Sequence, residues 1–185
     1  MIQLLMAAGL GLVFSIFGTP LLIKVLARHG YGQYIRDDGP TSHQTKRGTP
    51  TMGGVAILLS VVAAYLVTHL ISVILWPANG GITLSGVLAL ALMLGMGLVG
   101  FLDDYKKISQ KQNLGLTPAG KMVLQGAIGS AFAVLVLFFP DEAGNTPAST
   151  AISWTRDTGI DLAFAGPVVG LLLFVVWVNL IATGT

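Results

Sequence analysis

The apolar positions of this chain fall into five long runs. Each run is 18 to 25 residues long, and none contains Asp, Glu, Lys or Arg. A helix needs about 20 apolar residues to cross a bilayer, and a backbone in hydrocarbon must satisfy its own hydrogen bonds. We therefore predict an all-α polytopic membrane protein with five transmembrane helices. The five runs are residues 2–23, 52–76, 82–102, 122–139 and 162–182.

The composition supports this interpretation and excludes two other classes. Apolar residues make up 54% of the 185 residues and charged residues only 10%, with a mean hydropathy of +0.79. A soluble domain is about 25% charged, and a disordered chain has low hydrophobicity, so both classes are excluded. The absence of cysteine excludes a disulfide framework and a thiolate metal site. Residues 1–185 contain no repeat, and we interpret them as a single membrane domain.

The basic residues predict an orientation. Of the ten Lys and Arg residues, all except Arg156 lie in or beside the loops that follow the first and third runs. Because Lys and Arg collect on the cytoplasmic side of membrane proteins, we predict an outside N-terminus and a cytoplasmic C-terminus. The pI near 9.0 is thereby explained by topology, and we expect no nucleic-acid partner.

Two adjacent acids, Asp103 and Asp104, follow the third run directly. At a helix C-terminus the dipole disfavours carboxylates, so a cation should compensate them: Lys106, Lys107 or a metal ion. Carboxylate oxygens beside a phosphate suit Mg²⁺, which keeps several waters and shares its ligands with substrate. The alternative is that the acid pair simply ends a helix in water.

Two predicted helix starts lie on the same side as these acids. Thr49-Pro50 and Thr117-Pro118 each place a capping threonine before a proline, a typical start of a helix. The free N–H groups of a helix N-terminus favour a phosphate or pyrophosphate. Lys121, in the first turn after Thr117, would be stabilised there by such an anion. The alternative for the lysines is the general excess of positive charge on the cytoplasmic side.

Two pairs of small residues predict close contacts between helices. Ala91 with Gly95, and Gly166 with Gly170, have the four-residue spacing that lets membrane helices approach one another. The alternative is that glycine is common in membrane helices.

Three segments of the chain resemble motifs of one enzyme family. They read SHQTKRGTPTMGG at residues 42–54, GFLDDYKK at 100–107, and a loop and helix start at 117–125. In order and spacing they resemble the phospho-N-acetylmuramoyl-pentapeptide transferases (the MraY family), within the polyprenyl-phosphate N-acetylhexosamine-1-phosphate transferases. The first string favours the muramoyl-pentapeptide member over siblings that use other sugars.

The resemblance implies a reaction and a location. These enzymes move phospho-N-acetylmuramoyl-pentapeptide from UDP to undecaprenyl phosphate with Mg²⁺, giving lipid I and UMP. This is the first membrane step of peptidoglycan synthesis, on the cytoplasmic face of the bacterial inner membrane. The implied partners are the UDP-linked muramoyl-pentapeptide, undecaprenyl phosphate and the lipid bilayer. A homodimer is compatible with this assignment.

Site residues follow from the resemblance position by position. Asp103 is implied as the base that deprotonates or orients the lipid phosphate, and Asp104 as the residue that holds Mg²⁺. Four further residues match positions that line the substrate cleft: Lys46, Thr51, Lys107 and Lys121. The resemblance covers only the N-terminal half of a family with about ten membrane helices, against five predicted here. We therefore expect these residues alone to be a fragment with little or no transferase activity.

Two other functions stay open. One is a sibling transferase that uses a different nucleotide sugar. The other is a non-enzymatic transport or assembly module of the membrane. Charges along a transport path would be expected near mid-span, where His69 is the only candidate. The alternative for His69 is a histidine packed against its neighbours.

Overall fold

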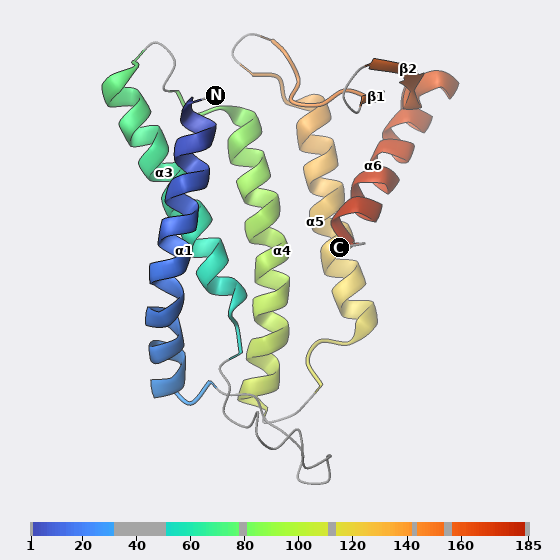
Figure 1. Cartoon of the computed structure of the whole chain (residues 1–185). Coiled ribbons are helices and arrows are strands. Elements are labelled where there is room, and N and C mark those ends of the chain that lie inside the picture. Colours follow the sequence, from blue (N-terminus) through green and yellow to red (C-terminus); the bar gives the residue numbers. More distant parts are fainter. Residues whose placement is uncertain are drawn as a thin grey trace. The chain divides into compact units, whose positions relative to one another are not determined.

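Helices and one small hairpin make up the part of the chain that the structure describes. This computed structural model describes residues 2–31, 51–77, 81–110, 114–141, 144–153 and 157–183. The elements are α1 (Ile2–Arg28), α3 (Gly54–Leu75), α4 (Leu84–Ser109), α5 (Pro118–Phe138), β1 (Ala151–Ser153), β2 (Asp157–Asp161), the 3-10 helix η1 (Leu162–Ala165) and α6 (Pro167–Thr183) (Figure 1).

Four of these helices have the length and composition of membrane spans. By both criteria α1, α3, α4 and α5 can cross a bilayer, which confirms the helices predicted from the first four apolar runs. Many of their large apolar side chains are exposed, such as Leu4, Phe17 and Leu70. An apolar surface of this extent is typical of a protein that contacts lipid or other membrane helices.

The fifth predicted helix begins later than the apolar run that predicts it. Residues 162–165 form η1, and the α-helix α6 starts only at Pro167 and is 17 residues long. The carboxylate of Asp161 accepts a hydrogen bond from the Ala163 N–H and caps η1, and Gly166 then adopts a φ of 108°. That left-handed backbone, followed by a proline, separates the two helices. The prediction of one helix from 162 is wrong at its start.

A short antiparallel hairpin precedes η1. Ala151 pairs with Asp161 and Ile152 with Ile160, with a register shift between Ile152 and Ser153. The prediction of a purely helical chain did not include this hairpin.

The boundaries of α3 and α4 also differ from the predicted spans. The helix α3 begins at Gly54, two residues after the predicted start. The helix α4 continues to Ser109, so Asp103 and Asp104 lie within its last two turns and not at its end. Lys106 and Lys107 occupy the last turn, where cations interact favourably with the helix dipole.

The chain divides into two compact units, and α4 contributes to both. The first unit comprises Met1–Ile82 and Gly97–Thr117, and the second comprises Thr83–Met96 and Pro118–Thr185.

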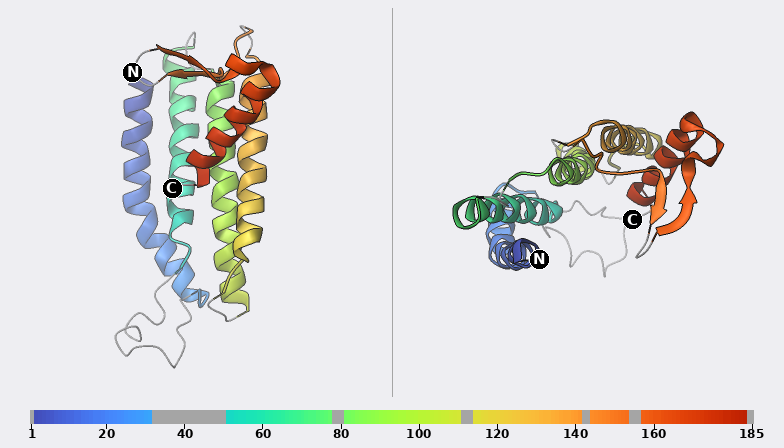
Figure 2. Two further views of the ribbon diagram at one scale, coloured as in Figure 1. Left: turned by 90° about the vertical axis from the view of Figure 1, so that its right-hand side faces the viewer. Right: turned by 90° about the horizontal axis from the view of Figure 1, so that it is seen from above.

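In the first unit, α1 packs along α3 through small residues (Figure 2). Every fourth residue of one α3 face is small and buried: Ala56, Ser60, Ala64, Thr68 and Ser72. Gly11 and Gly18 of α1 face this surface, so that a Cβ at these positions would lie 3.7 Å from Ala64 Cβ and 3.9 Å from Ser60 Oγ. The C-terminal ends of α1 and α4 and the beginning of α3 lie at the same end of this unit (Figures 1 and 2).

In the second unit, α5 packs against both α4 and α6. A Cβ at Gly95 would lie 2.9 Å from Ile128 Cγ2, so the glycine of the first predicted small pair lies against a side chain of α5. The second pair is wrong as a contact between helices. Gly166 lies outside α6, and Gly170 packs against Ala163 of η1.

Candidate functional site

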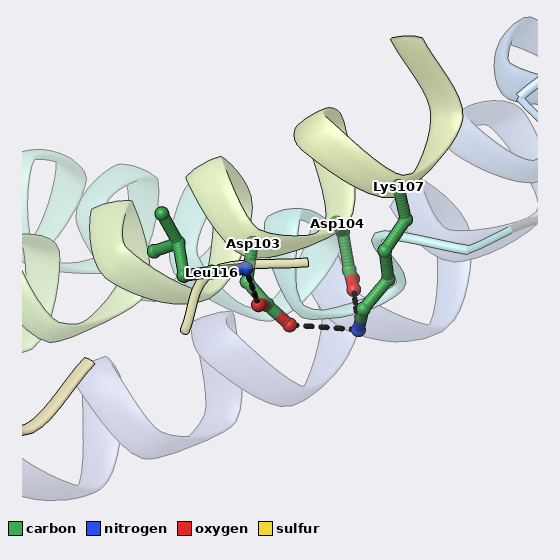
Figure 3. Close-up of polar contacts among 4 residues, drawn as sticks. All are labelled: Asp103, Asp104, Lys107 and Leu116. Carbon is green, nitrogen blue, oxygen red and sulfur yellow. Dashed lines mark hydrogen bonds and ion pairs between the residues drawn. The ribbon is translucent and has the colours of Figure 1, made fainter. Parts of the chain in front are cut away.

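One lysine joins the two adjacent acids of α4. Lys107 Nζ lies 2.7 Å from Asp103 Oδ2 and 3.1 Å from Asp104 Oδ1 (Figure 3). Lys107 follows Asp104 by three positions and Asp103 by four on one helix, and both spacings bring its side chain next to theirs. Lys107, one of the compensating cations that the sequence suggested, therefore contacts both acids.

The carboxylate of Asp103 is buried and has a second partner. Asp103 is only 6% exposed, and its Oδ1 accepts a hydrogen bond of 2.7 Å from the backbone N–H of Leu116 (Figure 3). A buried carboxylate is stable only when it is paired and hydrogen-bonded. Both oxygens of Asp103 are thus engaged, one by a helix side chain and one by the loop before α5.

Asp104 differs from Asp103 in exposure and in its contacts. Its side chain is 34% exposed, and only its Oδ1 contacts Lys107. Within the described part of the chain, Asp104 Oδ2 has no hydrogen-bond or ion-pair partner. This oxygen is the one that can accept a cation or a substrate donor without breaking a contact.

The donors around Asp104 fit a magnesium ion that is shared with a phosphate. Among the described residues, no group of three or more His, Cys, Asp and Glu side chains comes together. Mg²⁺ commonly takes one or two carboxylates and completes its shell with water and substrate phosphate. A metal enclosed by protein ligands alone does not fit the described residues.

Thr51 lies just before α3, at the end of the first unit where α4 also ends. Its N–H donates a hydrogen bond of 3.2 Å to the carbonyl oxygen of Tyr31. Its Oγ1 is buried and has no hydrogen-bond partner among the described residues. The next residue, Met52, is buried with a φ of 69°, a left-handed conformation that is rare outside glycine. Lys46 lies outside the described residues. The predicted start of the second helix at Thr49-Pro50 is wrong, because residues 51–53 are not helical and α3 begins at Gly54, after the N-cap Gly53.

Lys121 lies in the first turn of α5 and is half-buried. The helix begins at Pro118, directly after Thr117, as the Thr-Pro pair predicted. Lys121 belongs to the second unit, whereas the other described candidates belong to the first.

Gly115 and Leu116 are two residues of the site that the sequence reasoning missed. Leu116 contributes only its backbone, which no side-chain pattern reveals. Gly115 lies directly against Asp103, and the only available signal was a glycine between two leucines in a short loop.

His69 packs within α3. Its ring meets the ring of Tyr65 edge to face, with centroids 4.5 Å apart. This geometry agrees with the packed histidine considered from the sequence.

Comparison with known proteins identifies the family of this chain. The signature of the phospho-N-acetylmuramoyl-pentapeptide transferases matches residues 46–58. A phospho-N-acetylmuramoyl-pentapeptide transferase of Kocuria rhizophila is 94% identical over all 185 residues, which cover 49% of the relative. The transferase of Micrococcus luteus is 59% identical over the whole chain and 50% of its own length. That of Renibacterium salmoninarum is also 59% identical, over 99% of this chain and 50% of the relative.

The chain belongs to the phospho-N-acetylmuramoyl-pentapeptide transferase family. The resemblance read from the motifs is therefore confirmed. The chain spans about half the length of the curated relatives that it matches. The match to the signature begins at Lys46 and includes Thr51, so two candidate residues lie within a segment that characterises the family.

Proposed function

We propose that this chain provides the acidic site of an enzyme that transfers phospho-N-acetylmuramoyl-pentapeptide from UDP to undecaprenyl phosphate. The products would be lipid I and UMP, in the first membrane step of peptidoglycan synthesis. The observation that carries the proposal is the cluster of Asp103, Asp104 and Lys107, with one carboxylate oxygen open, in a chain that matches this family throughout.

The proposed reaction exchanges one phosphorus–oxygen bond for another. An oxygen of the acceptor phosphate bonds to the phosphorus that carries the sugar, and the bond from that phosphorus to UMP breaks with its electron pair. Both reactants are anions, so much of the barrier comes from their repulsion and from positioning. Cationic side chains and a divalent ion at one site lower that repulsion.

The residues divide into two groups in this proposal. Asp104, through its open Oδ2, would hold Mg²⁺, whose charge would offset that of the phosphates when it is bound. Asp103 would deprotonate or orient the lipid phosphate. Four residues would bind the substrates: Lys46, Thr51, Lys107 and Lys121. Thr51 would do so through its buried hydroxyl, which has no partner among the described residues.

The location follows from the substrates and the charges. A donor made in the cytosol and an acceptor held in the bilayer must meet at the inner face of the bacterial inner membrane. The excess of Lys and Arg in the loops around the acid pair supports a cytoplasmic position for that end.

The test is an assay for UMP release and lipid I formation. It uses a completed protein, in which these 185 residues replace the aligned half of the Kocuria rhizophila relative. We expect turnover that needs Mg²⁺ and undecaprenyl phosphate. Absence of UMP release from folded, membrane-inserted completed protein would contradict the proposal.

The same assay separates two narrower questions. A sibling transferase would release UMP with a different nucleotide sugar, so the sugar found in the lipid product decides between them. The 185 residues by themselves are expected to show little or no turnover, and robust activity of this chain alone would overturn that expectation.

A further inference from the structure

The contact between Asp103 and the loop before α5 is unusually close. A Cβ at Gly115 would lie 2.6 Å from Asp103 Cγ and 2.8 Å from the Asp103 carbonyl oxygen, distances that real Cβ atoms do not show. Gly115 is not among the described residues with a positive φ, so its backbone conformation does not require glycine. Space alone therefore excludes a side chain at position 115.

The loop also holds the carboxylate of Asp103 through a hydrogen bond. Leu116 N–H reaches Asp103 Oδ1 across 13 positions of sequence, and the bond is a charge-assisted one. The other oxygen of Asp103 contacts Lys107, whose side chain is 36% exposed and also contacts Asp104. An anionic substrate that drew Lys107 away would leave the hydrogen bond from the Leu116 N–H in place on this buried carboxylate.

We propose that Gly115 and Leu116 form a seat for Asp103, fixing its carboxylate through the Leu116 N–H and through the absence of a side chain at position 115. Both are positioning residues, because they act on the reaction through Asp103. The seat holds Asp103 Oδ2 where it shares Lys107 with Asp104, and this arrangement leaves Asp104 Oδ2 open. The link to catalysis rests on the proposed function, whereas the seat itself does not.

Amide hydrogen exchange of Leu116 in the 185-residue chain, in detergent micelles, tests the seat without any enzymatic activity. We expect Gly115→Ala and Asp103→Ala each to speed exchange of the Leu116 amide by about tenfold or more, because a hydrogen bond to a charged group is lost. The double variant should exchange within about twofold of Asp103→Ala alone, because both changes break the same bond. Asp103→Asn, which keeps an acceptor, should retain part of the protection.

Gly100→Ala is the matched control, since it adds the same methyl group on α4 where nothing lies within 4 Å. Its Leu116 exchange should equal that of the unsubstituted chain. Unchanged exchange of the Leu116 amide in Gly115→Ala would contradict the proposed seat. If Gly115→Ala does not fold by circular dichroism, equal exchange in Asp103→Ala and the unsubstituted chain overturns it instead.

A second readout separates positioning from mere folding. In the completed protein, Gly115→Ala should lower kcat about tenfold or more per folded molecule, with KM for the nucleotide donor little changed. A loop with only a structural role would lower the amount of folded protein and leave kcat intact, which would refute the positioning role. If the unsubstituted completed protein shows no transfer, the proposed function fails while the exchange result still decides the seat.

Discussion

Asp103 and Asp104 are adjacent in sequence but stand in different environments. Asp103 is buried with both oxygens engaged, whereas Asp104 is 34% exposed and has one oxygen without a partner among the described residues. Both carboxylates contact Lys107, and Asp103 also accepts a hydrogen bond from the loop before α5. The division of roles that we propose for the two acids is based on this difference.

Replacing either acid in the completed protein should therefore have distinguishable effects. We expect Asp103→Asn and Asp104→Asn each to lower kcat/KM by about 100-fold or more, with membrane insertion unchanged. Only Asp104→Asn should also raise the Mg²⁺ concentration needed for half-maximal rate, because it removes the charge of the carboxylate whose Oδ2 would hold the ion. Initial rates over a magnesium series measure both effects.

Asp141→Asn is the control for loss of one negative charge, since this exposed acid lies on the loop after α5. Near-normal rates in both Asp103→Asn and Asp104→Asn would remove the assigned roles.

The sequence predicted the acid pair and its cation but not the environment of the pair. Charge spacing on a helix is local, so the sequence could offer Lys106 and Lys107 as partners, and the structure pairs Lys107 with both acids. The bond from Leu116 depends on how a loop folds back over 13 residues, which no local pattern encodes. Gly115 was missed for the same reason, because its requirement is steric and comes from a distant residue.

At the scale of elements, the pairing of α5 with α6 includes one close approach. Asn179 Nδ2 donates to Ser130 Oγ over 3.2 Å, and a Cβ at Gly129 would lie 2.6 Å from Asn179 Oδ1. Glycine lets the two helices approach until this hydrogen bond forms. A larger residue at position 129 must push Asn179 away.

Gly129→Ala should therefore destabilise the chain by about 1–3 kcal/mol through overpacking. Gly126→Ala is a matched control on the same helix, because its Cβ would meet Asn179 Oδ1 at an ordinary 3.8 Å. That control should be neutral or slightly stabilising, since alanine favours helix. Thermal unfolding in mild detergent compares the two, and equal midpoints would show that the contact at Gly129 is not restrictive.

The turn before α6 carries a titratable cap. Hydrogen bonds from the Thr150 side chain and then from the Ala163 N–H lower the pKa of Asp161 below its ordinary value. A depressed folded pKa means that the contribution of this cap is present above the unfolded pKa of about 3.9 and is lost as pH falls through the folded value. The cap should thus be intact at neutral pH.

Carbon-13 NMR of the Asp161 carboxyl in micelles measures this directly. We expect its midpoint to lie below that of an aspartate in an unfolded peptide, with Asp161→Asn identifying the signal. A midpoint at or above the peptide value would mean that the carboxylate does not cap η1.

Element boundaries show where sequence reasoning was incomplete. Hydropathy located the spans because it sums over many residues, but it could not divide residues 162–182 at Gly166-Pro167. That division depends on the backbone of one glycine and on the Asp161 cap. Likewise, α4 extends beyond its apolar run because ion pairs with Lys107 stabilise helix in the polar part.

For the whole molecule, the orientation in the membrane decides whether the proposed site can meet its substrates. The charge distribution predicts that the end of α4 lies in the cytoplasm and the loop after α5 outside. The chain contains no cysteine, so a single introduced cysteine reports its own side of the membrane without background. Gln110 and Asn145 are suitable positions, because both are exposed and one follows α4 while the other follows α5.

We expect a membrane-impermeant maleimide to label Asn145→Cys in intact bacterial spheroplasts and Gln110→Cys only after the membrane is permeabilised. A permeant maleimide, which should label both, controls for reactivity. Labelling of Gln110→Cys in intact spheroplasts would invert the topology. Asp104 and Lys107 would then face away from any donor made in the cytosol, and a transferase at this site would have no access to its nucleotide substrate, whatever the family match.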